Sequence, residues 1–158
     1  MQSILSNFQN QLLETALASS EEIQGCSAEE TEVIESKFKL QLPATYKDFL
    51  RICGHRAGEF YAGTDMFYPD ILELRAYAEN LLKENEVDFQ LPDAAFVFSM
   101  HQGYQFDYFH TEPQDDNPPV YYYLEGEKLP KKISESFSSF LLQSVEDHVR
   151  ILQQIRRI

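Results

Sequence analysis

Apolar residues recur at intervals of three and four along the first part of the chain, the spacing that places side chains on one face of a helix. This pattern predicts a helix over residues 2–19. A second helix should follow Ser27, because Ser27 and Glu30 have the spacing of a capping box. A third should begin at Pro43, whose missing N–H costs nothing in a first helical turn, and end at Gly54.

The spacing of apolar residues changes from helical to alternating after residue 93. Strict alternation is typical of strands, so we expect three strands of an antiparallel meander over residues 94–99, 103–110 and 119–124. An apolar stripe then returns at helical spacing. It predicts a long final helix capped by Ser134 or Ser136.

Helices that lead, a sheet that follows and a helix that closes the chain are typical of an α+β fold. Residues 59–61 and 66–68 are candidate short strands between the third helix and a fourth, which Asp70 should cap. We expect a central, mainly antiparallel twisted sheet, flanked by the N-terminal helices and the long C-terminal helix. Residues 1–158 have the length of one domain, with no internal repeat or linker.

Negative charge is concentrated in the middle of the chain. Residues 57–127, the acidic block, contain fifteen carboxylates and only two cations, Arg75 and Lys83, which accounts for the formal net charge of −13. The flanks are neutral. Such a surface disfavours nucleic acid and anionic membranes as partners and favours a cationic protein. General acidity of a cytoplasmic domain is the alternative explanation.

The acidic block also holds fifteen of the twenty-one aromatic residues. Aromatic side chains on both faces of the sheet require either helices on both sides or one partly open face. Tyrosine is enriched in protein interfaces because it offers a large contact area and retains a hydroxyl. We therefore predict that a partner contacts six residues of this block: Tyr104, Asp107, Tyr108, Asp115, Asp116 and Tyr122.

The chain has no pattern that identifies a catalytic or metal site. His101, Asp107 and His110 could meet across a hairpin, but an odd spacing puts Asp107 and His110 on opposite faces of a strand. Cys26 and Cys53 lack the spacing of a metal or redox pair. There is no phosphate-binding glycine loop and no nucleophile elbow, and no one pair of carboxylates stands out as hydrolytic. We expect no enzymatic activity, no metal and no cofactor.

Several segments, in order, resemble the SUKH superfamily of bacterial immunity proteins and fungal cell-wall-synthesis regulators. The resemblance covers about residues 23–145. It rests on these segments: Gly25-Cys26-Ser27-Ala28-Glu29-Glu30, Leu42-Pro43-Ala44-Thr45-Tyr46-Lys47-Asp48-Phe49-Leu50, Phe67-Tyr68-Pro69, Gly103-Tyr104-Gln105-Phe106 and Ser136-Phe137-Ser138-Ser139-Phe140-Leu141. One departure is Cys53-Gly54, where family members often have Asn-Gly.

The resemblance implies a non-catalytic protein that binds and neutralises a cognate toxin, often a nuclease. An acidic surface is consistent with this role, since a nuclease is basic where it binds its substrate. Two alternatives remain: a regulatory or scaffold module without a toxin partner, and a hydrolase or small-molecule-binding domain. Exposed aromatic residues could also support a homodimer. The chain has no apolar run that would span a bilayer and no secretory leader, so we expect a cytoplasmic location.

Overall fold

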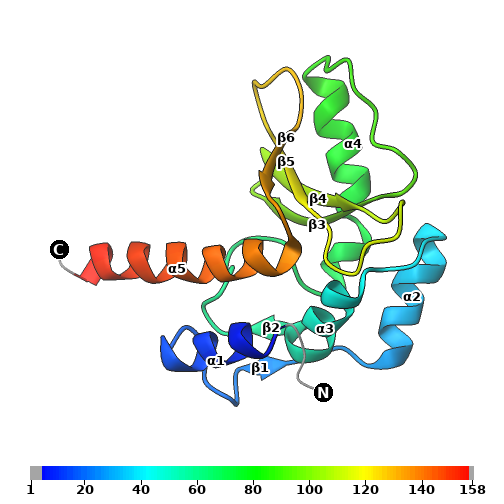
Figure 1. Cartoon of the computed structure of the whole chain (residues 1–158). Coiled ribbons are helices and arrows are strands. Elements are labelled where there is room, and N and C mark those ends of the chain that lie inside the picture. Colours follow the sequence, from blue (N-terminus) through cyan, green and yellow to red (C-terminus); the bar gives the residue numbers. More distant parts are fainter. Residues whose placement is uncertain (1–4, 157–158) are drawn as a thin grey trace.

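A computed structural model describes residues 5–156, and it has the expected α+β architecture (Figure 1). The helices are α1 (Ser6–Glu14), α2 (Ala28–Phe38), α3 (Ala44–Cys53), the short 3-10 helix η1 (Asp70–Leu72), α4 (Leu74–Glu84) and α5 (Phe137–Arg156). The strands are β1 (Ile23–Gln24), β2 (Arg56–Ala57), β3 (Ala95–His101), β4 (Gln105–His110), β5 (Val120–Leu124) and β6 (Lys131–Ser134).

The helix boundaries follow local chemistry. Ser27 caps α2 as predicted: its Oγ accepts from the Glu30 N–H at 3.2 Å, and its own N–H donates to Glu30 Oε1 at 2.9 Å. Pro43 is the N-cap of α3, one position before the first helical residue. Of the two candidate caps for the last helix, Ser136 has the role, because its Oγ accepts from the Ser139 N–H at 3.1 Å.

Four details of the prediction were wrong. Asp70 does not cap α4: it begins the 3-10 helix η1, and α4 starts at Leu74 after its N-cap Glu73. The first helix ends at Glu14, because Ala16 has a positive φ of 60°; residues 1–4 lie outside the described part of the chain. Residues 59–61 and 66–68 do not form strands but turns and bends, part of them a tight turn in which the Ala62 N–H donates to the Glu59 carbonyl. The short strands β1 and β2 pair with each other instead, and β6 was not predicted.

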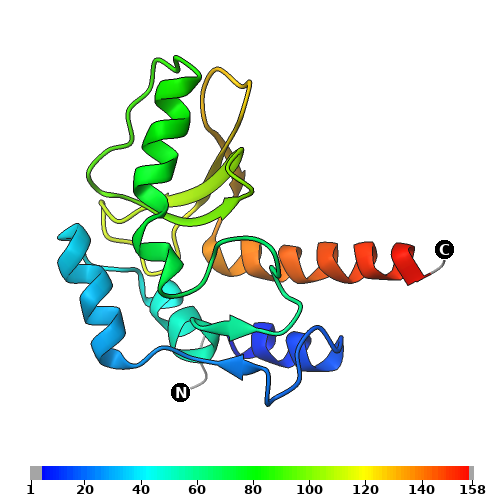
Figure 2. The same ribbon diagram turned by 180° about the vertical axis from the view of Figure 1, so that it is seen from behind.

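The main sheet is an antiparallel meander in the order β3-β4-β5-β6, which confirms the three predicted strands and adds a fourth at the edge. Helix α4 packs against β3 on one face of this sheet (Figure 2). On the other face the rings of Phe98 and Phe109 meet Phe137 of α5 at 5.2 and 5.8 Å. Helices therefore cover both faces, which explains why both carry aromatic residues.

Tyr46 of α3 lies at the centre of the aromatic core and is fully buried. Its ring centroid is 5.2 to 6.3 Å from those of five phenylalanines, on α3, β3, β4 and α5: Phe49, Phe96, Phe98, Phe109 and Phe137. Ring contacts at these separations add to the area they bury. This cluster joins the meander to the N-terminal helices, and α5 passes between the two (Figure 1).

Candidate functional site

The carboxylates of the acidic block lie on the outside of the molecule. Thirteen of the fifteen are exposed, Glu127 is half-buried, and Asp107 is the one that is buried. They belong to α4, to the turns beside it and to the loops around the meander, which form one part of the fold. Flank cations lie beside some of these carboxylates, since Lys37 and Lys39 line a hollow together with Glu79, Asp93 and Glu112.

Of the two cations of the block, Arg75 is held within the fold by hydrogen bonds. The Arg75 guanidinium donates to the carbonyls of Leu91, Pro92 and Ala95 at 2.8 to 3.0 Å and to Glu79 at 2.6 Å. Its side chain is only 19% exposed. Lys83 is thus the only exposed cation of the block, all of which the structure describes.

The aromatic residues of the block are mostly inside. Seven of the fifteen are buried and seven are half-buried, whereas Tyr77 is 48% exposed. Tyr77 lies on the outer face of α4, and sequence reasoning did not select it. Helical spacing gave no clear signal, because Tyr77 is three residues after Leu74 and four before Leu81, both of which α4 buries.

Carboxylates surround Tyr77 and form what we call the α4 patch: Asp65, Asp70, Glu73 and Tyr77. The Tyr77 hydroxyl donates to Glu73 Oε2 at 3.1 Å. This hydrogen bond, together with the negative charges of Glu73, Asp65 and Asp70, raises the pKa of Tyr77. Beside the patch, a hollow between α4 and the β3–β4 turn is lined by residues that include Asp65, Tyr77, Glu84, Met100 and Gly103. The surface thus joins an exposed ring to three carboxylates, with Lys37 of α2 beside Glu73 and Tyr77 in a neighbouring hollow.

Two of the six predicted contact residues are buried, which corrects their assignment to the surface. Tyr108 is 2% exposed and stacks on Tyr121, with ring centroids 5.5 Å apart. Asp107 is 7% exposed and accepts from Ser99 Oγ at 2.6 Å. Burial raises the pKa of Asp107 to about 6, partly offset by its hydrogen bonds from Ser99 and Gln105. Both residues lie on inner strand β4, with helices over both faces of the sheet.

The other four predicted contact residues are accessible but do not form one surface. Tyr104 is half-buried in the β3–β4 turn with its ring edge-on to His101, and Tyr122 is half-buried on β5. Asp115 and Asp116 are exposed in the loop between β4 and β5. That loop is fixed at its base, because Thr45 donates to the Asp116 carbonyl through its N–H at 2.9 Å and its hydroxyl at 2.8 Å.

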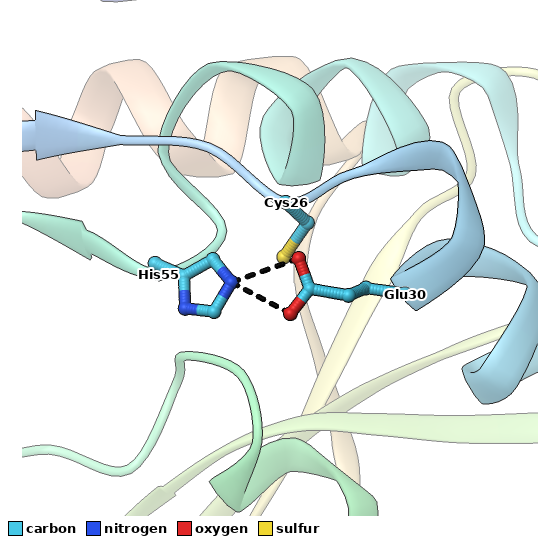
Figure 3. A group of neighbouring side chains, drawn as sticks. All are labelled: Cys26, Glu30 and His55. Atoms are coloured by element: carbon cyan, nitrogen blue, oxygen red, sulfur yellow. Dashed lines mark hydrogen bonds and ion pairs between the residues drawn. The ribbon is translucent and has the colours of Figure 1, made fainter.

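A second group of polar side chains lies where β1, α2 and α3 meet. Cys26 precedes the N-cap of α2, Glu30 is in its first turn, and His55 follows α3. One potential ligand atom from each lies within 4.8 Å of the other two (Figure 3). His55 Nε2 is 2.9 Å from Glu30 Oε1 and 2.8 Å from Oε2. Sequence reasoning missed this group because 25 residues separate Glu30 from His55.

The geometry of this group does not suit a cysteine nucleophile. A cysteine nucleophile that is activated by a histidine and a carboxylate needs one imidazole nitrogen at the thiol and the other at the carboxylate. Here Nε2 serves the carboxylate and lies beside the thiol, while the other ring nitrogen points away from both (Figure 3). Burial and the Glu30 carboxylate also raise the pKa of the Cys26 thiol to about 12, which keeps it protonated.

The candidate pair His101 and His110 does not converge either. His101 pairs with Gln105 and His110 with Ala95, so the two histidines lie at opposite ends of the β3–β4 ladder. The His101 ring is held by Thr64, whose hydroxyl is 2.7 Å from Nδ1. In the part of the chain that the structure describes, no helix has the length and apolar character needed to cross a membrane.

Comparison with known proteins agrees with this fold. A solved structure of an uncharacterized protein from Salmonella enterica subsp. enterica serovar typhimurium str. 14028s matches with a TM-score of 0.53 and 13% identity. The match covers 92% of this chain and 78% of that one. It shows similarity of fold alone. No curated protein matches the chain.

A family model gives a more specific result. The model of the SMI1 / KNR4 family (SUKH-1) matches residues 25–143, which include α2, α3, α4, the whole meander and the start of α5. Proteins of this family are in general non-catalytic domains of the immunity or interaction type. Because the match spans well over half of the sequence, the chain belongs to the SMI1 / KNR4 (SUKH-1) family.

Proposed function

We propose that this protein is a non-catalytic immunity protein, which binds and neutralises a cognate protein toxin through its acidic surface. A nuclease-type toxin fits this proposal best, since an enzyme that acts on a polyanion has a basic surface. Such a partner would be held by charge complementarity and excluded from its substrate.

One observation carries the proposal: the acidic block exposes thirteen carboxylates and a single cation, Lys83. Like charges repel one another, so such a surface costs folding stability while it favours solubility, and a cationic partner would relieve the repulsion. Opposite charge on a partner would speed encounter and fix its orientation. Long-range attraction of this kind weakens as salt is added, since the screening length is about 8 Å at physiological ionic strength.

Within this surface the α4 patch is our leading contact region. A lysine or arginine of the partner could lie over the Tyr77 ring and pair with Asp65 or Glu73. The ring is available, since nearly half of Tyr77 is exposed. A cation over a tyrosine face contributes about 0.5 to 2 kcal/mol, more as water is excluded. Of the predicted contact residues, Tyr104, Asp115, Asp116 and Tyr122 remain candidates for a wider footprint.

Co-purification with the product of the neighbouring gene tests the proposal. We expect a complex whose association rate falls steeply between low and physiological salt, and protection of cells that express that product. The absence of both a complex and protection would contradict the proposal. Capture of several unrelated proteins without protection would instead favour a regulatory or scaffold module.

A further inference from the structure

We propose that Cys26, Glu30 and His55 form a zinc-binding site that joins the start of α2 to the end of α3. Zinc accepts thiolate sulfur, imidazole nitrogen and carboxylate oxygen, and these three residues supply one of each. Three protein ligands and one water molecule complete a tetrahedral site. The Cys26 thiol gives its proton to solvent as the sulfur binds the metal. The proton that His55 Nε2 donates to the Glu30 carboxylate also leaves that nitrogen, and the neutral imidazole keeps its N–H on Nδ1.

The separations of the donor atoms suit a small metal ion. Ligands that are about 2.0 to 2.3 Å from one tetrahedral zinc ion lie roughly 3.3 to 3.7 Å from each other. The donor atoms here lie within 4.8 Å of one another, and the imidazole and the carboxylate are in hydrogen-bond contact at 2.8 Å. Side-chain movements of about 1 Å therefore bring all three to binding distance.

The backbone already holds the three residues in place. The Cys26 N–H donates to the Leu50 carbonyl at 2.7 Å, and the His55 N–H donates to the Gln24 carbonyl at 2.9 Å. Gly54 lies so close that an added Cβ would be 2.4 Å from the Cys26 sulfur. A site assembled before the metal arrives loses little conformational freedom on binding.

Glu30 is oriented for binding through a single oxygen. Its Oε1 accepts the Ser27 N–H at 2.9 Å as part of the capping box, which leaves Oε2 for the metal. Hydrogen bonds of this kind orient ligands in metal sites and strengthen binding. The Glu30 and His55 side chains are 28% and 27% exposed, so an ion and its water molecule can enter from solvent.

Metal titration of the untagged, full-length protein tests this inference independently of any toxin. The metal-free protein is titrated with Co²⁺, whose thiolate charge-transfer absorption reports a bound sulfur, and then with Zn²⁺ in competition with a chromophoric chelator. We expect one ion per chain, a thiolate band and a higher melting temperature with zinc. No saturable binding to the folded protein would overturn the inference.

Three variants assign the ligands. Cys26→Ser should abolish the thiolate band, whereas Cys53→Ala, the matched control at the other buried cysteine, should keep it. Glu30→Gln keeps an acceptor for the Ser27 N–H, so the helix cap survives while zinc affinity should fall at least tenfold. A band that persists in Cys26→Ser, or unchanged affinity in Glu30→Gln, would overturn the assignment. The zinc affinity of Glu30→Gln tests the ligand assignment even if Cys26→Ser does not fold.

Discussion

The acidic block and the flanking segments use their charges in opposite ways. In the flanks, cations and carboxylates pair with each other: Lys47 with Glu35, Arg51 with Asp48, Lys132 with Glu135 and Arg150 with Asp147. In the block, thirteen carboxylates are exposed and the ion pair of Arg75 with Glu79 is the one recorded within it. The flank charges therefore pair mostly with each other, whereas among the described residues the carboxylates of the block are in ion pairs only at Glu79 with Arg75 and at Glu127 with Lys131 of the flank.

The largest difference is expected in folding stability, when one arginine is truncated in the acidic block and one in a flank. Arg75→Ala should lower the free energy of unfolding by about 3 kcal/mol, because three backbone carbonyls lose a charged donor. Arg51→Ala is the matched control: its side chain is 64% exposed, so its ion pair should contribute less than about 0.5 kcal/mol. Denaturant unfolding measures both. Equal losses would show that Arg75 has no special structural role.

The buried carboxylate of the block should respond to pH. The pKa of Asp107 rises from 3.8 in the unfolded chain to about 6 in the fold, so the native state binds the extra proton between these values. Stability contributed by this group is therefore present below about pH 4 and lost as pH rises toward 6. Asp107→Asn should flatten this dependence and raise stability at pH 7 by about 2 kcal/mol, less than the full effect of the pKa shift.

Unfolding of wild type and of Asp107→Asn at pH 4, 5, 6 and 7 measures this effect. Asp115→Asn, a carboxylate exposed in the loop, is the control and should leave the pH dependence unchanged. Parallel curves for wild type and Asp107→Asn would contradict the assignment of the titrating group.

Charge reversal in the α4 patch should slow association with a partner more than charge reversal in a flank does. Asp65→Lys combined with Glu73→Lys should slow association with the co-purified partner about tenfold, equivalent to about 1.4 kcal/mol, and reduce its dependence on salt. Glu32→Lys on the exposed face of α2 changes a flank carboxylate and should have little effect. Stopped-flow mixing at several salt concentrations measures the rates. An equal effect of Glu32→Lys would place the contact surface elsewhere.

The smallest expected effect concerns the capping box of α2 in the N-terminal flank. Ser27→Ala removes the acceptor for the Glu30 N–H and should lower stability by about 1 kcal/mol. Ser20→Ala, at an exposed position before β1, is the control. Thermal unfolding compares the two variants. No difference between them would mean that the capping box contributes little here.

Most of the fold follows from local patterns in the sequence. Alternation over 94–99, 103–110 and 119–124 located β3, β4 and β5, and the capping box located the start of α2. The short strands β1 and β2 have two residues each, too few for any periodicity. Edge strand β6 carries Lys131 and Lys132, and it was missed because an exposed strand has no apolar alternation.

The candidate sites were harder to predict because they depend on which elements cover which faces. Alternation correctly put Asp107 and Phe109 on one face of β4, but it could not show that helices cover both faces. Tyr77 was overlooked because a tyrosine on a helix is exposed or buried according to its neighbours in space. Glu30 and His55 meet only through the packing of α2 against α3, which no local pattern contains.

The anchoring of the β4–β5 loop has a consequence for how this protein could diversify. Thr45 binds the main-chain carbonyl of Asp116 and makes no demand on the side chain there. The side chains of Gln114 and Asp116 are both exposed, so they can be exchanged while the path of the loop stays the same. Substitutions at these positions could therefore adapt the loop to a changed binding partner without affecting the packing of the core.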